Sequence, residues 1–179
     1  KLDKGLSTDL IITSAGVSKG DYDVVKDVLS ERGNIDFWSV RMRPAKPLAF
    51  GFIDGEHGKA IPHLGLPGNP VSCLIAFEIF GRPAILKMLG KSNLHKRTVQ
   101  AILKGRITNP DKRRVFARVR VSKQNEVYYA TPTGPQGSNI LTSMSKANGL
   151  AICHENIPFK ASGDSVKVIL LDSNNDFPI

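Results

Sequence analysis

The sequence has few cysteines and no long apolar run. Its two cysteines, Cys73 and Cys153, lie far apart, which argues against a disulfide framework and against a CxxC metal site. No window approaches the ~20 uninterrupted apolar residues that a membrane span needs. The four histidines show no ligand spacing with one another or with the cysteines, so a zinc site is not favoured. These absences predict a protein of the reducing cytoplasm with no membrane partner.

The second half of the chain is poor in acidic residues. Residues 1–90 carry a net charge of +1, whereas residues 91–179 carry +8 of the total of +9. A surface of this kind attracts anions, including nucleic acid, phosphorylated cofactors and acidic partners. The chain also begins at Lys1 without a methionine or a signal pattern, and we therefore expect a fragment of a longer protein.

One turn-rich stretch, residues 64–72, joins a short apolar run to a long apolar helix. Pro70 suits the first helical turn, and Asn69 before it suits the cap. Free N–H groups of Val71 and Ser72, beside the Ser72 hydroxyl, would then favour a phosphate or another oxyanion. A tight connector between a strand and a helix is the alternative.

Short apolar runs alternate with helical patterns in the first half, which predicts an α/β fold with a partly parallel sheet. The predicted strands cover residues 9–13, 37–42, 48–53 and 61–66, and the apolar helix covers residues 70–88. The helix is apolar nearly all round, so we expect it to be buried between layers. Pro83 should kink or split it at Gly81-Arg82, and Gly90 should end it. Polar loops at 14–23, 43–47 and 67–72 could gather on one edge of the sheet.

Beyond residue 91 the pattern changes to short alternating runs, which predicts a small β-barrel or sandwich. In residues 114–121 the valines and Ala117 lie on one face, and an arginine row lies on the other. These arginines could clamp phosphate or could merely protect an edge strand.

Two loops of the first half offer further groups for anions. Residues 14–20 resemble a phosphate cradle, and Asp21 and Asp23 behind them could share Mg²⁺ with a phosphate. The alternative for Asp21 is a helix cap. Arg43 and Lys46 lie between prolines in a stiffened loop, where they either bind an anion or are ordinary solvated charges.

Several motifs together resemble the molybdopterin molybdenumtransferase family, of the MoeA and gephyrin E-domain type. They are SAGVSKGDYD at 14–23, RPAKP at 43–47, LPGNPVS at 66–72, and TGPQGS at 133–138 followed by Ser143, Asn148 and Gly149. The resemblance covers essentially the whole chain. It implies the later part of a MogA-like three-layer α/β domain over residues 1–91, and a small all-β barrel over residues 92–179.

The resemblance also implies a reaction, the insertion of molybdate into adenylylated molybdopterin with release of AMP and with Mg²⁺ assisting. Carried over by motif, Asp23, Lys46 and Arg43 are the catalytic residues, and Asp23 is the metal ligand. The residues implied in substrate binding are Ser14, Gly16, Ser18, Gly68, Asn69, Pro70, Ser72, Arg118 and Ser138. The implied partners are a second copy of the full-length protein and the molybdopterin adenylyltransferase, with no specific nucleic acid.

The chain departs from the family in two respects. Alanines at 15 and 45 stand where the family usually has glycine, which narrows the approach of a ligand to the backbone. The family's preceding domains are also missing, so we expect no molybdenum insertion by this chain alone. A basic nucleic-acid-binding module over residues 91–179, or a scaffold module, is the alternative function.

Overall fold

The computed structural model describes residues 5–17, 28 and 31–171, and the chain forms two compact units. The first unit comprises Lys1–Val40 and Ala45–Ile85, and the second comprises Arg41–Pro44 and Leu86–Ile179. Residues 41–44 thus join the second unit, whereas the sequence-based division places them in residues 1–91. The cause is a strand pairing, because β3 (Met42–Arg43) pairs with β8 (Arg114–Gln124).

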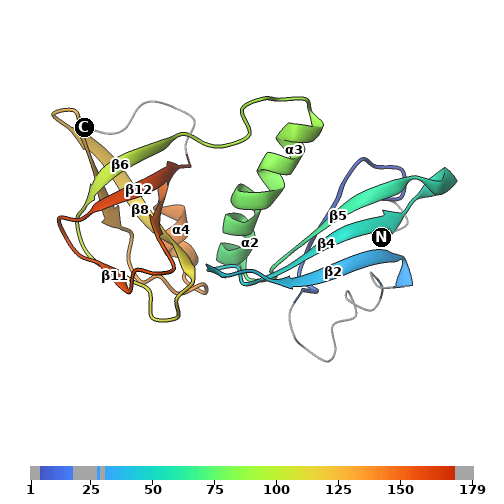
Figure 1. Ribbon diagram of the computed structural model, residues 1–179, viewed down its shortest axis with the longest axis horizontal. Helices are drawn as coiled ribbons and strands as arrows, with labels where there is room; N and C mark the ends of the chain where they lie inside the picture. Colours follow the sequence, from blue (N-terminus) through green and yellow to red (C-terminus); the bar gives the residue numbers. More distant parts are fainter. Residues whose placement is uncertain (1–4, 18–27, 29–30, 172–179) are drawn as a thin grey trace. The chain divides into compact units, whose positions relative to one another are not determined.

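A four-stranded sheet forms the centre of the first unit (Figure 1). Its strands, in the order in which they lie, are β1 (Ile11–Ser14), β5 (Ala60–Leu66), β4 (Pro47–Asp54) and β2 (Gly33–Ser39). The short 3-10 helix η2 (Glu56–Gly58) connects β4 to β5. β1 is parallel to β5, and the other pairs are antiparallel. The predicted α/β fold with a partly parallel sheet is therefore confirmed.

The predicted apolar helix is present in three consecutive segments. They are α2 (Pro70–Ala76), the π-helical η3 (Phe77–Gly81) and α3 (Arg82–Met88). The predicted division at Gly81-Arg82 is confirmed, since the wider turn directly precedes Pro83, which has no N–H to donate. Gly90, at φ +69°, ends the helix as predicted, because its N–H donates to Lys87 O and that of Lys91 donates to Leu86 O.

Burial of this helix is one-sided. Val71, Ile75 and Ala76 are fully buried in α2, which contacts β5. Leu74, by contrast, is 44% exposed, and α3 has no buried residue. The prediction of burial on all sides is therefore wrong. The apolar pattern on the second side reflects exposed positions rather than a second packed layer among the described residues.

A buried histidine lies on the central strand β5. His63 is fully buried, and its Nε2 lies 3.0 Å from Thr13 Oγ1 on β1. Its Nδ1 has no hydrogen-bond partner among the described residues. Burial lowers the pKa of His63, because the charged imidazolium loses its hydration.

We expect this histidine to make the first unit sensitive to acid. Between the ordinary histidine pKa of about 6.5 and the lower folded value, the unfolded chain binds a proton that the folded chain does not. The free energy of unfolding should therefore fall as pH drops through this window, by up to about 1.4 kcal/mol per pH unit. Urea unfolding of the wild type and of His63→Gln at pH 7 and pH 5.5 measures this fall in the free energy of unfolding. Equal slopes for both proteins would contradict the prediction, since the other three histidines are common to both.

The second unit is a closed barrel of five strands (Figure 1). In order around the barrel they are β10 (Gly149–Cys153), β12 (Ser165–Leu170), β6 (Thr98–Leu103), β9 (Val127–Pro132) and β8, which pairs with β10 again. β7 (Ile107–Thr108) and β11 (Phe159–Lys160) form a separate short ladder, and α4 (Leu141–Ser145) precedes β10. The predicted barrel is confirmed.

The alternating apolar residues of 114–121 face the interior of this barrel. Its buried apolar cluster includes Val115, Ala117, Val119 and Val121 from β8, joined by Val99, Ala101 and Leu103 from β6, Ala151 from β10 and Val168 from β12. Because side chains along a strand point to alternate sides, the intervening residues of β8 face outward. This part of the sequence prediction is confirmed.

Candidate functional site

The loops after β1 and β5 lie side by side in the first unit. Ser14 ends β1, and the N–H of Ala15 donates to Leu66 O at 3.0 Å. A Cβ placed on Gly68 would lie 3.2 Å from the Cβ of Ala15. The structure therefore brings the predicted residues of these two loops, Ser14, Gly16 and Gly68, to one edge of the sheet.

The loop before β4 reaches the same edge. β4 is antiparallel to β5, with Ala49 opposite Gly65, so the start of β4 lies where β5 ends. Lys46 precedes this strand; its carbonyl accepts from Val40 N at 2.8 Å, and its side chain is exposed. The first unit thus presents an exposed ammonium, a serine and glycine-rich backbone at this edge.

The start of α2 differs from the expectation in one respect. Asn69 caps the helix, and its Oδ1 accepts from the N–H groups of Val71 (3.2 Å) and Ser72 (3.4 Å). These two N–H groups are therefore not free for an anion, because the cap satisfies them first. The Ser72 side chain lies in a buried position. Pro70 occupies the first helical turn, as predicted.

Two of the loop positions carry an alanine in the left-handed region. Ala15 has φ +88° and Ala45 has φ +70°. An alanine there costs about 1 kcal/mol relative to glycine. Gly16, at φ +81°, continues the same conformation after Ala15. The backbone thus keeps the shape that glycine favours although a methyl group is present.

A pocket of about 250 Å³ lies within the second unit. Arg43, Arg106 and Arg118 line it, together with the loop residues 134–136. Arg43 comes from β3, Arg106 from the turn between β6 and β7, and Arg118 from β8. Three cations from distant parts of the sequence therefore meet around one cavity, an arrangement suited to an oxyanion.

Arg118 is buried and held by several hydrogen bonds. It is 1% exposed, and its Nε donates to Ser143 Oγ at 3.0 Å. Its Nη1 donates to Gln136 O, and its Nη2 donates to the carbonyls of Pro135 and Gly137. Four of its five N–H groups are thus satisfied in the described part of the chain, and one on Nη1 remains for a ligand.

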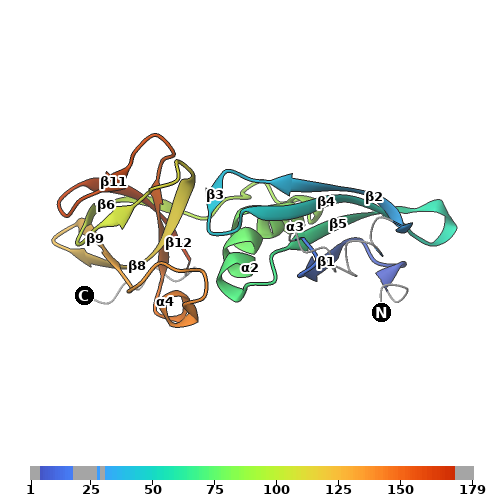
Figure 2. The same cartoon turned by 90° about the horizontal axis from the view of Figure 1, so that it is seen from below.

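The loop around Arg118 is fixed by a second set of bonds. The Gln136 side chain accepts from Arg118 N at 2.8 Å and donates to Arg118 O at 3.2 Å. Thr133 Oγ1 donates to Ser143 O at 2.6 Å. The loop therefore covers the outward face of β8 at Arg118, and Figure 2 shows α4, which carries Ser143, outside the barrel strands.

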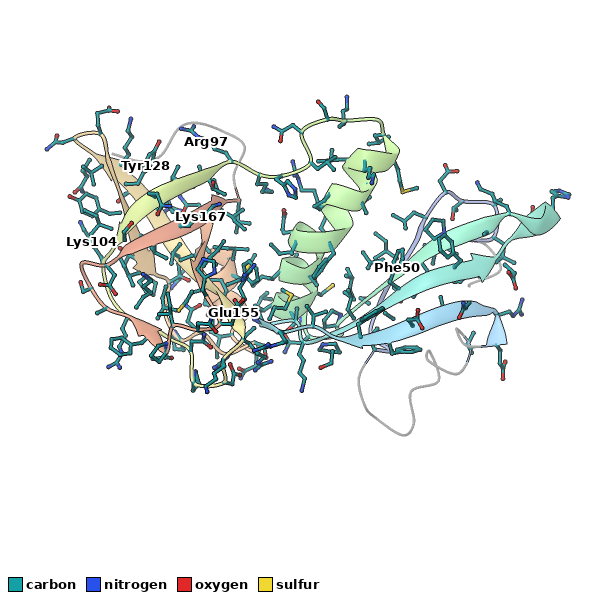
Figure 3. The ribbon with its side chains drawn as sticks, in the orientation of Figure 1. Phe50, Arg97, Lys104, Tyr128, Glu155 and Lys167 are labelled. Carbon is teal, nitrogen blue, oxygen red and sulfur yellow. The ribbon has the colours of Figure 1, made fainter. Side chains whose placement is uncertain are left out.

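Because the loop covers part of this face, the predicted arginine row on β8 is not uniformly exposed. Phe116 is buried and Arg118 is buried beneath the loop, whereas Arg120 is exposed. Arg114 donates to Glu155 from Nε at 3.1 Å (Glu155 is labelled in Figure 3). Strand alternation assigns the face but does not reveal which part of that face a distant loop covers.

The electrostatics of the pocket are those of an anion site. Within the described residues no carboxylate forms an ion pair with Arg118. Burial lowers the pKa of Arg118, and the positive charge of Arg43 lowers it further. The guanidinium of Arg106 lies 4.7 Å from the centre of the Phe159 ring, within the range of a cation–π interaction. An oxyanion would offset this concentration of like charge.

Sequence reasoning missed two members of this pocket. Arg106 follows a glycine in a short turn and has no recognisable signal, and Gln136 belongs to the TGPQGS motif but is not among the predicted site residues. Of the predicted residues, Ser138 is half-buried directly after Gly137 and is not a lining residue. Ser18 and Asp23 lie outside the described residues. In the part that is described, no group of three or more His, Cys, Asp or Glu could hold a metal ion.

Comparison with known families accounts for nearly the whole chain. Residues 100–171 match "MoeA C-terminal region (domain IV)", and residues 1–87 match "Probable molybdopterin binding domain". The chain belongs to the MoeA family. It corresponds to the C-terminal portion of that family, which confirms the resemblance found in the sequence.

Individual relatives agree. "Molybdopterin molybdenumtransferase 2" of Mycobacterium tuberculosis is 35% identical over 169 residues, which cover 91% of this chain and 40% of the relative. "Molybdopterin molybdenumtransferase" of Haemophilus influenzae is 33% identical over 89% of this chain and 39% of the relative. The chain thus spans about 40% of the length of these curated relatives.

A solved structure shares the fold. The molybdopterin biosynthesis MoeA protein of Pyrococcus horikoshii aligns with a TM-score of 0.73 and 29% identity, over 97% of this chain and 40% of that one. In our MoeA-family chain, no helix in the described residues is long and apolar enough to cross a membrane.

Proposed function

We propose that this chain supplies part of the substrate-binding machinery for molybdenum insertion into adenylylated molybdopterin, with release of AMP. The observation that carries the proposal is the pocket lined by the buried Arg118 together with Arg43 and Arg106. Among the described residues, Arg118 has no carboxylate as an ion-pair partner. Family membership supports the reading of this anion as molybdate.

The residues of the pocket would act by binding and by electrostatics. Fixed guanidinium groups bind an oxyanion through directed, charge-assisted hydrogen bonds. Because the loop fixes the position of the Arg118 guanidinium before binding, little reorganisation is needed there when charge develops on oxygen during transfer. In the first unit, Lys46, Asn69 and Ser72 provide polar groups that we assign to the phosphate of the pterin substrate.

Magnesium enters this proposal only through Asp23. Among the described residues no group of three or more His, Cys, Asp or Glu could hold a metal ion, so no step is derived through the metal. We also propose, on the family assignment alone, a homodimer of the full-length protein in the cytoplasm, served by the molybdopterin adenylyltransferase.

Calorimetric titration of the 179-residue chain with molybdate tests the pocket. We expect saturable binding that weakens with added salt, and no molybdenum insertion when adenylylated molybdopterin, molybdate and Mg²⁺ are supplied together. Cofactor formation at the rate of an intact relative would disprove the expectation that this chain is inactive alone. Absence of any molybdate binding would remove the proposed function.

A further variant tests the loop of the first unit. Ser72→Ala should weaken binding of molybdopterin about tenfold, which is the effect of losing one hydrogen bond to a charged group. Folding should change little, because alanine is the better helix former. Ser39→Ala, which removes an exposed hydroxyl from the same unit, is the matched control. Unchanged affinity in Ser72→Ala would restore the interpretation of this stretch as a plain connector.

A further inference from the structure

One carboxylate lies close to the arginines of the pocket. Asp111 Oδ2 is 4.0 Å from Arg43 Nη1 and accepts from Arg113 Nε at 2.8 Å. Arg113 and Arg43 lower the pKa of Asp111, so the carboxylate is charged at neutral pH. Neither Arg118 nor Arg106 has an ion pair of this kind in the described part of the chain.

The backbone, and not Asp111, holds Arg43 at the pocket. β3 pairs with β8, and Arg114 N donates to Arg41 O at 2.9 Å. Arg113 Nη1 donates to Met42 O at 3.3 Å, and Arg41 Nη2 donates to Lys112 O at the same distance. The contact of Asp111 with Arg43 is long by comparison, and the side chains are 35% and 38% exposed. This contact can therefore be exchanged without dismantling the strand pairing.

Arg43 also contributes to the like-charge repulsion inside the pocket. Its charge acts on Arg118, which is buried and cannot be relieved by water. A carboxylate beside Arg43 partly offsets that repulsion when no ligand is bound. An oxyanion bound in the pocket would also offset the repulsion between Arg43 and Arg118.

We propose that Asp111 is the resident counter-ion of this pocket, which competes with an incoming oxyanion for the guanidinium of Arg43 and thereby sets the oxyanion affinity. The inference rests on the proposed function, since it concerns the same pocket. Asp111 would thus have a role in oxyanion affinity that no motif in its sequence context predicts.

The test compares Asp111→Asn with Glu126→Gln in the 179-residue chain. Glu126 pairs with Lys123 on the same unit, and its removal changes the net charge equally. It lies in the turn after Gln124, the last residue of β8, which is six residues beyond Arg118, roughly 20 Å at the strand rise and about two Debye lengths at 0.1 M salt. Calorimetric titration with molybdate and with inorganic phosphate gives the affinities.

We expect Asp111→Asn to bind molybdate several-fold more tightly than the wild type, and Glu126→Gln to remain within twofold. The gain should vanish in an Arg43→Ala background, because the competition acts through that guanidinium. A loss of affinity in Asp111→Asn, no change, or an equal gain without Arg43 would each overturn the proposal.

A ligand-free measurement separates this inference from the proposed function. At low ionic strength the melting temperature of Asp111→Asn should drop by a few degrees, and Arg43→Ala should reverse the drop, since it removes the repulsion that Asp111 offsets. If no protein binds molybdate but this pattern appears, the proposed function fails and the counter-ion role stands. If the melting temperature is unchanged, the counter-ion role fails whether or not molybdate binds.

Discussion

Arg118→Met is expected to weaken molybdate binding by about 100-fold, which corresponds to about 3 kcal/mol for a buried charge-assisted contact. Methionine fills much of the space of the arginine stem but removes all five N–H donors. The remaining N–H on Nη1 and the buried positive charge are both lost. Titration with molybdate at fixed ionic strength measures the change.

The same substitution should also loosen the loop that covers the pocket. The carbonyls of Pro135, Gln136 and Gly137 would lose their donor. Circular dichroism shows whether the barrel remains folded, and Arg118→Lys keeps the charge while losing the planar fork. We expect the lysine variant to bind with intermediate affinity.

Arg120→Met is the matched control for this experiment. It removes the same charge from the same strand and the same side, but from an exposed position. We expect its affinity to stay within a few-fold of the wild type. Equal losses at 118 and 120 would show that only overall charge matters, and wild-type affinity in Arg118→Met would place the anion elsewhere.

Asn148→Ala is expected to destabilise the barrel by about 3 kcal/mol, the cost of leaving two buried backbone groups unpaired. The Oδ1 of Asn148 accepts from Val121 N at 2.6 Å, and its Nδ2 donates to Val121 O at 3.0 Å. Both residues are buried, so water cannot replace these bonds. The side chain acts as a short piece of strand beside β8.

Urea unfolding followed by circular dichroism measures this loss. Trp38 is the only tryptophan in the chain and belongs to the first unit, so its fluorescence should show little change if the loss is confined to the barrel. Asn93→Ala, in an exposed loop position, should leave stability within about 0.5 kcal/mol of the wild type. A small effect in Asn148→Ala would mean that the strand relaxes to satisfy Val121 by other bonds.

Local patterns in the sequence were sufficient for most of the secondary structure. The two-residue alternation around Val119 located β8 and its inward face, because a strand presents alternate residues to alternate sides. Gly90 marked the helix end, since glycine accepts the positive φ that this end requires. Pro83 marked the change of helical winding, because it lacks the N–H of a regular turn.

Local patterns were not sufficient where two groups compete for one partner. The anion site expected at Val71 and Ser72 needed free N–H groups, but the Asn69 side chain takes both. A sequence with a good cap residue at the start of a helix is compatible with two outcomes: the cap side chain accepts from the first N–H groups, or these groups remain free for an anion. The distances in the folded chain decide between them.

The exposed aromatics of the first unit show a similar limit. Phe50 is 46% exposed on β4 (Figure 3). Its ring lies 6.0 Å from that of Phe52 in an edge-to-face arrangement. Hydropathy alone predicts that such residues are buried. Exposure depends on which segments of the fold cover each face of the sheet, and this cannot be read from the strand itself.

The sequence by itself determined the family, the two kinds of unit and the basic character of the second, because motifs, periodicity and charge are local properties of the chain. Only the tertiary structure showed that two residues of the first half, Met42 and Arg43, pair with β8 and bring a third arginine to Arg106 and Arg118. It also placed Asp111 beside Arg43 and covered Arg118 with a loop. These contacts join residues up to about 75 positions apart and depend on strand pairing, which no local pattern specifies.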